Sequence, residues 1–190
     1  AFAQNARGMD LLDDELMGDA LFIIRDSLLL GLSTENFILP SSVVMRGQVL
    51  DRVGYFSETL SGPEDFELWW RMGLAKVCFA YIDEIYVTRY KPPGSLSSPS
   101  LSQTENRLRA LDMCLHNALE KGREDLVPYL ECLYRNSYQH AISLYAAEGD
   151  FRRMFGAFLK SLRYGVSLGS FRLLFESVFG FGLRRGQNDN

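Results

Sequence analysis

The residues best suited to chemistry lie together in one stretch, Gly62-Pro-Glu-Asp-Phe-Glu-Leu-Trp-Trp-Arg71. Its adjacent carboxylates, Glu64 and Asp65, follow a proline that suits the first turn of a helix. The positive end of the helix dipole stabilises carboxylates there in their ionised form. Such a group can take up a proton in general acid–base catalysis. Acids in a first turn and tryptophans in a helix are also ordinary features of a core, so both interpretations stay open.

The elements that must position this stretch are predicted from periodicity and turn residues. Before residue 92 we expect three helices (19–30, 47–53 and 66–73) and three strands (37–46, 76–82 and 85–90). Gly54 ends the second helix, and an acidic turn, Asp83-Glu84, joins the last two strands. Residues 1–19 predict a surface loop or a frayed helix, and the Pro/Ser-rich stretch 92–100 predicts a loop or linker.

The sequence after residue 100 predicts four helices, which cover residues 101–120, 125–147, 150–164 and 170–180. Gly122, Gly149 and Gly165 mark their boundaries. The third of these helices places Phe151, Met154, Phe155, Phe158, Leu159 and Leu162 on one apolar face. The chain therefore divides near residue 100 into a mixed α/β part and a helical part.

The composition is globular, with 47% hydrophobic and 23% charged residues among 190, which excludes a disordered tail or a collagen-like fibre. The chain has three cysteines, an odd number, and they form no C-x-x-C pair: Cys78, Cys114 and Cys132. They argue against a disulfide framework or a zinc site and favour a reducing compartment. Neither a run of about 18 apolar residues nor a signal-peptide pattern occurs, so we expect a cytoplasmic protein.

The net charge of −4 is unevenly distributed, because residues 151–186 carry +6 and the rest carries −10. An acidic chain predicts no nucleic-acid partner. The basic, Phe-rich tail leaves two interpretations open. Its apolar residues, such as Phe171 and Phe175, pack on the rest of the chain, or they lie with flanking arginines on an anionic membrane surface. The second interpretation places residues 151–186 peripherally at the inner membrane surface.

An ordered series of segments over residues 20–100 resembles the C-terminal half of the catalytic domain of family 2 glycosyltransferases, which have the GT-A fold. The segments are Ser41-Ser-Val-Val-Met-Arg46, Val49-Leu-Asp-Arg-Val-Gly-Tyr-Phe56, Gly62-Pro-Glu-Asp65, Leu68-Trp-Trp-Arg71, Val87-Thr-Arg89 and Gly94-Ser-Leu-Ser97. The resemblance implies an α/β fold, namely the distal half of a GT-A domain over residues 1–100. A helical extension then occupies residues 101–190.

The resemblance also implies roles for single residues. Asp65 matches the catalytic base that takes the proton of the acceptor hydroxyl during an inverting displacement at the sugar. Glu64 matches an acidic neighbour on the acceptor side, and Trp69 either stacks on a sugar or packs in the core. Arg89 matches an arginine near the diphosphate; the alternative for it is a salt bridge to Asp83 or Glu84. Lys91 stands where the family often has a histidine, so it contacts phosphate rather than a metal.

The family's donor-binding half, which ends in an Asp-x-Asp metal motif, has no counterpart before Asp19. We therefore expect a divalent metal, Mn or Mg, only in the complete enzyme and expect these residues alone to be inactive. The implied partners are a nucleotide-sugar donor and a glycan or lipid-linked acceptor. The competing hypothesis is a non-catalytic protein whose helices from residue 101 onward form an interaction scaffold.

Overall fold

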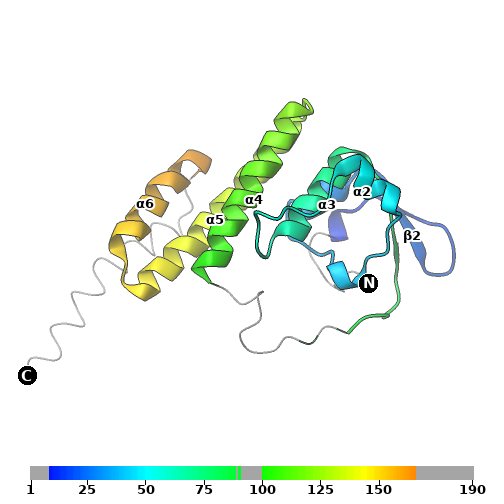
Figure 1. The fold of residues 1–190 in the computed structure, drawn as a ribbon, viewed down its shortest axis with the longest axis horizontal. Helices are drawn as coiled ribbons and strands as arrows, with labels where there is room; N and C mark the ends of the chain where they lie inside the picture. Colours follow the sequence, from blue (N-terminus) through cyan, green and yellow to red (C-terminus); the bar gives the residue numbers. More distant parts are fainter. Residues whose placement is uncertain (1–8, 89, 91–99, 166–190) are drawn as a thin grey trace, which may run out of the picture.

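The computed structural model describes residues 9–88, 90 and 100–165 of the chain. In this part most of the regular structure is helical, with one small antiparallel sheet. Figure 1 shows the sheet, α2 and α3 toward one end of the molecule and α4, α5 and α6 toward the other. The prediction of a chain with both helices and strands is confirmed in this coarse form, whereas the GT-A assignment stays a prediction.

The sheet has three strands in the order β1 (Asp14–Leu16), β2 (Leu21–Ile24) and β3 (Phe79–Ile82). Ile24 and Phe79 lie opposite each other in the register, and Ile24 is buried. The predicted helix over 19–30 is wrong in its first half, because pairing with both neighbouring strands favours extended backbone for this β-branched and aromatic run. The surface loop or frayed helix predicted over 1–19 is wrong at β1, because these residues pair with β2.

Two other predicted strands are also wrong within the described residues. In the segment 37–46, Pro40 starts a 3₁₀ turn, Pro40–Ser42, and no neighbouring strand pairs with the residues on either side. Residues 85–88 form no strand either, and Ile85 and Tyr86 are exposed. The strand predicted over 76–82 begins only at Phe79, because Lys76 adopts a left-handed conformation just after α3.

Three short helices precede the C-terminal helical part: α1 (Leu28–Leu32), α2 (Gly47–Val53) and α3 (Glu64–Leu74). The predicted helices over 47–53 and 66–73 are confirmed. Gly54 ends α2 with a φ of 86°, which a residue with a side chain rarely adopts. The α3 helix buries nearly all of its middle, including both tryptophans. It is therefore the central element of this end of the molecule.

The C-terminal part consists of α4 (Leu101–Glu120), α5 (Val127–Glu148) and α6 (Phe151–Ser161), and it confirms the three predicted helices that fall on described residues. Ser100 and Asp150 cap α4 and α6 by accepting backbone N–H groups. The helix predicted over 170–180 and the loop predicted over 92–99 lie outside the described residues. None of the described helices is long and apolar enough to cross a membrane.

One buried cluster joins the two parts of the chain. Leu111 and Cys114 of α4 and Leu130 of α5 belong to the same core as Trp69 and Trp70 of α3. A second, smaller cluster is contributed by α5 and α6 and comprises Ala141, Ile142, Tyr145, Met154, Ala157 and Phe158. The α4 helix therefore packs onto α3, α5 packs onto α4, and α6 packs onto α5.

Candidate functional site

The predicted base, Asp65, lies in the first turn of α3 and is half-buried. Its Oδ1 accepts the backbone N–H of Phe66 at 2.6 Å. The helix begins here because Pro63 precedes it and three acidic residues occupy its first turn, which the helix dipole favours. The position in the first turn is as the sequence predicts.

The charge state of Asp65 differs from the expectation. Burial raises its pKa above the ordinary value, and the negative charge of Glu64 raises it further. Hydrogen bonds from the Phe66 backbone and the Asn36 side chain lower the pKa without offsetting burial. Desolvation disfavours the charged form of a carboxyl, and here it outweighs the stabilisation expected from the helix start. A carboxylate with a raised pKa is a stronger proton acceptor while it stays ionised.

Asn36 is a neighbour of Asp65 that sequence reasoning missed. Its side chain hydrogen-bonds Asp65, and its Oδ1 is buried without a hydrogen-bond partner. A buried, unpaired amide oxygen is uncommon in folded proteins. The only signal in the sequence is a polar residue just before the buried pair Phe37 and Ile38, and this signal does not indicate contact with α3.

Glu64 turns back toward the loop before α3, where its Oε2 accepts the backbone N–H of Gly62 at 2.5 Å. Gly62 has a φ of 110°, and a Cβ placed there would collide with the side chain of Gln103. Gln103 belongs to the first turn of α4. The acidic helix start is therefore bordered by α4, which the sequence treated as a separate helical extension.

A buried ion pair fixes the next turn of α3. Arg71 donates from Nε and Nη2 to the two carboxylate oxygens of Glu67, at 2.7 and 2.8 Å. The same guanidinium donates to the carbonyl oxygens of Val53 and Tyr55. Glu67 is 1% exposed and also accepts from Asn117 of α4. This i, i+4 pair thus joins α3 to α4 and to the chain at the end of α2.

Trp69 and Trp70 are both completely buried. Trp69 packs edge-on against Phe56, with ring centroids 6.2 Å apart, and Trp70 packs against Phe66 at 6.0 Å. In this arrangement Trp69 has no surface to stack on a sugar, so of the two roles considered for it the packing role is the one found. The indole N–H groups of both residues have no hydrogen-bond partner.

The remaining predicted contacts, Arg89 and Lys91, lie outside the described residues. Within the described part of the chain, no three His, Cys, Asp or Glu side chains gather to hold a metal ion. His116 lies on the surface beside Glu120, 3.3 Å away. Cys78, which directly precedes β3, is exposed.

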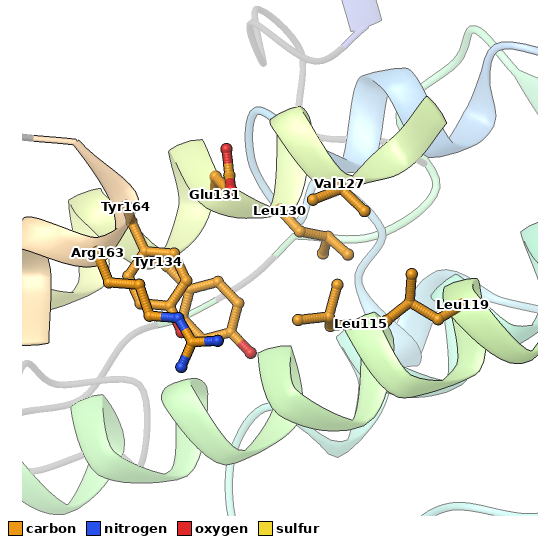
Figure 2. Close-up of a pocket in the computed structure, with 8 residues that line it drawn as sticks. All are labelled: Leu115, Leu119, Val127, Leu130, Glu131, Tyr134, Arg163 and Tyr164. Carbon is orange, nitrogen blue, oxygen red and sulfur yellow. The ribbon is translucent and has the colours of Figure 1, made fainter. Parts of the chain in front are cut away.

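A small cavity of about 230 Å³ lies between α4, α5 and the turn after α6. Figure 2 shows Leu115, Leu119 and Leu130 on one side of it and the stacked rings of Tyr134 and Tyr164 on the other. These two rings are 4.4 Å apart and nearly parallel. The cavity is smaller than ligand pockets, which hold about 300–1,000 Å³. It is better explained as a packing gap between helices.

Comparisons of this chain with protein-family models, with curated proteins and with solved structures find no match.

Proposed function

We propose that the part of the chain from β1 to β3 is the acceptor side of an inverting glycosyltransferase of the GT-A type. In this proposal Asp65 removes the proton from an acceptor hydroxyl. The hydroxyl oxygen then forms a bond to the anomeric carbon of the donor sugar, and the bond from that carbon to the nucleoside diphosphate breaks. The acceptor is a saccharide or a lipid-linked saccharide.

The single observation that carries this proposal is the environment of Asp65. Its carboxyl is half-buried in the first turn of α3, its pKa is raised by burial, and the Asn36 amide holds it. A base needs a pKa nearer the working pH than that of an exposed carboxylate. The family resemblance assigns the same residue independently, through the Glu-Asp pair that precedes Leu68-Trp-Trp-Arg71.

A transferase assay of the natural full-length protein tests the proposal. A panel of UDP-, GDP- and dTDP-sugars is offered with saccharide acceptors, and release of the nucleoside diphosphate is measured. We expect Asp65→Asn to lower kcat at least about 100-fold, the scale of a lost general base. Asp51→Asn is the matched control, since it makes the same charge change on the exposed face of α2 and should leave kcat unchanged. Near wild-type turnover in Asp65→Asn would remove this residue from the mechanism.

The competing proposal is a non-catalytic interaction module. The second buried cluster favours it, because α5 and α6 contribute this cluster without any residue of the sheet or α3. Helical pairs of this kind also occur in scaffolds that bind partners along a groove. The same assay separates the two proposals, since the full-length protein of a scaffold turns over none of the sugar nucleotides.

A further inference from the structure

A groove of about 540 Å³ lies between α4, α5 and α6. Its volume falls within the range of about 300–1,000 Å³ that ligand pockets occupy. The α4 residues that line it, such as Leu101, Glu105 and Leu108, recur at helical spacing and form one face of α4. Gln103 and Arg107, which approach the start of α3, lie on the opposite face of the same helix.

Charged side chains of both signs line this groove. The α4 wall carries Glu105, Asp112 and Arg109, and the α6 wall carries Arg153 and Lys160. Within the described residues the two walls form no ion pair with each other: Arg153 pairs with Asp150 of its own helix cap at 3.3 Å. The charged groups of both walls therefore line one shared space.

The floor of the groove is aromatic and polar. Tyr138 and Tyr145 of α5 line it, and the hydroxyl of Tyr145 donates to Glu105 at 3.2 Å. Asp112 accepts the hydroxyl of Tyr134 at 2.6 Å. Each carboxylate keeps further lone pairs for a ligand after these bonds, because an ionised carboxylate accepts about four hydrogen bonds. The groove therefore offers both acceptors and donors beside the half-buried ring of Tyr138.

This combination selects among classes of ligand. Two carboxylates oppose the binding of an anion, and three cationic side chains oppose the binding of a cation. A sugar is neutral, its hydroxyls donate to carboxylates and accept from guanidinium and ammonium groups, and its C–H faces pack on aromatic rings. We propose that the groove between α4, α5 and α6 binds a neutral oligosaccharide, the sugar chain of the acceptor.

The first two turns of α4 connect this groove to the candidate base. Gln103 lies against Gly62, next to Glu64 and Asp65, while Glu105 opens into the groove. Only the description of the bound chain as the acceptor rests on the proposed function; the binding of a sugar chain rests on the groove itself.

Gly156 supplies a sharp test of this site. It lines the groove from the middle of α6, and a Cβ built on it meets no atom within 4 Å. A side chain at this position therefore starts in open space beside the groove. Glycine is also unfavourable inside a helix, so Gly156→Leu should raise the melting temperature by about 2–4 °C while it fills the groove. Loss of binding in this variant cannot then be attributed to unfolding.

The experiment uses the full chain and a glycan array of linear oligosaccharides, two to six residues long, built from glucose, galactose, mannose or N-acetylglucosamine. Calorimetry then measures affinity for the glycan that binds best. We expect binding that strengthens with chain length and falls at least about tenfold in Gly156→Leu. Gly156→Ala, the matched control, adds only a methyl group and should keep the affinity within about threefold. Asp51→Asn, on the exposed face of α2, should leave the affinity unchanged.

Three outcomes overturn the proposal: no array glycan binds at about 1 mM, binding persists unchanged in Gly156→Leu, or a linear peptide library binds in a Gly156-dependent manner while glycans do not.

Failure of the proposed function is visible separately. If Asp65→Asn keeps full turnover while glycan binding still depends on Gly156, the groove is a sugar site without the catalytic role of Asp65. If both proposals hold, Gly156→Leu raises KM for long acceptors in the full-length enzyme and leaves kcat unchanged.

Discussion

Removing Arg71 should destabilise the protein more than any change to an exposed arginine. The Glu67 carboxylate is 1% exposed, and two guanidinium nitrogens of Arg71 bind its two oxygens. Arg71→Met keeps the length and much of the apolar stem of the side chain but removes the charge. It leaves a buried carboxylate without its cation and frees the backbone carbonyls of Val53 and Tyr55.

The expected magnitude follows from these contacts. Breaking one side of a buried ion pair costs about 3–5 kcal/mol, because the remaining charge stays desolvated. Asn117 still donates to Glu67, although at 3.4 Å this bond is long, so we expect the lower end, about 3 kcal/mol. For a chain of this size that loss lowers the melting temperature by about 6–12 °C. The exposed Arg109→Met, as a control, should cost less than about 0.5 kcal/mol.

The assay is urea unfolding followed by tryptophan fluorescence. The chain has two tryptophans, and both are buried in α3 beside the ion pair, so the signal reports this region directly. A double variant, Glu67→Gln with Arg71→Met, removes the orphaned charge and should recover most of the loss. A cost below about 1 kcal/mol for Arg71→Met, or an equal cost in the double variant, would refute the reasoning.

Two further predictions concern the start of α3. Because burial raises the folded-state pKa of Asp65, the folded protein binds this proton more tightly than the unfolded chain, and stability falls as pH rises from about 4 through the raised pKa. The urea midpoint of unfolding should therefore be higher for Asp65→Asn than for wild type at neutral pH, and the two midpoints should be equal near pH 3. A lower midpoint for Asp65→Asn at neutral pH would contradict this direction. Gly62→Ala should cost about 1–3 kcal/mol in urea unfolding because its φ of 110° strains a side chain. Adding Gln103→Ala should relieve only the collision, and full recovery in that double variant would show that the backbone carries no strain.

Local signals predicted the described helices from residue 47 onward well, and the reasons are visible in particular residues. Gly54, Gly122 and Gly149 all have positive φ values and end the helices they follow. Ser100 and Asp150 are capping residues whose side chains bind the expected backbone N–H groups. Each of these features depends on a few neighbouring residues, so the sequence alone contains it.

The sheet was harder to predict, because a strand depends on partners that are distant in the sequence. Leu21–Ile24 forms β2 because Asp14–Leu16 and Phe79–Ile82 pair with it on either side. Residues 37–46 and 85–88 have a similar β-forming composition. They pair with none of the described strands, and they form no strand themselves. Propensity for extended backbone is therefore realised only where a neighbour completes the hydrogen bonds.

For the site, sequence predicted the place of Asp65 but neither its pKa nor its neighbours, since both depend on packing. Asn36 and Gln103 come from segments on either side of α3, far away in the sequence, and reach the helix start only in the folded chain. The burial of Trp69 likewise reflects its contact with Phe56 and the shared core. A tryptophan in a helix gives the same signal whether it faces a ligand or a core.

The contacts of α4 argue that the helical part belongs to the candidate site. Phe66 directly follows Asp65, and the Arg107 guanidinium of α4 lies 6.0 Å from the centre of its ring. The Nε of Arg107 also donates to Ser137 of α5 at 3.2 Å. This guanidinium is buried enough that its pKa is lowered, so moving it would expose α3 and break the link to α5 together. The α4 helix therefore contacts the start of α3 with one face and lines the groove with the other. The proposed transferase would therefore use both faces of α4, whereas a scaffold would require only the groove face.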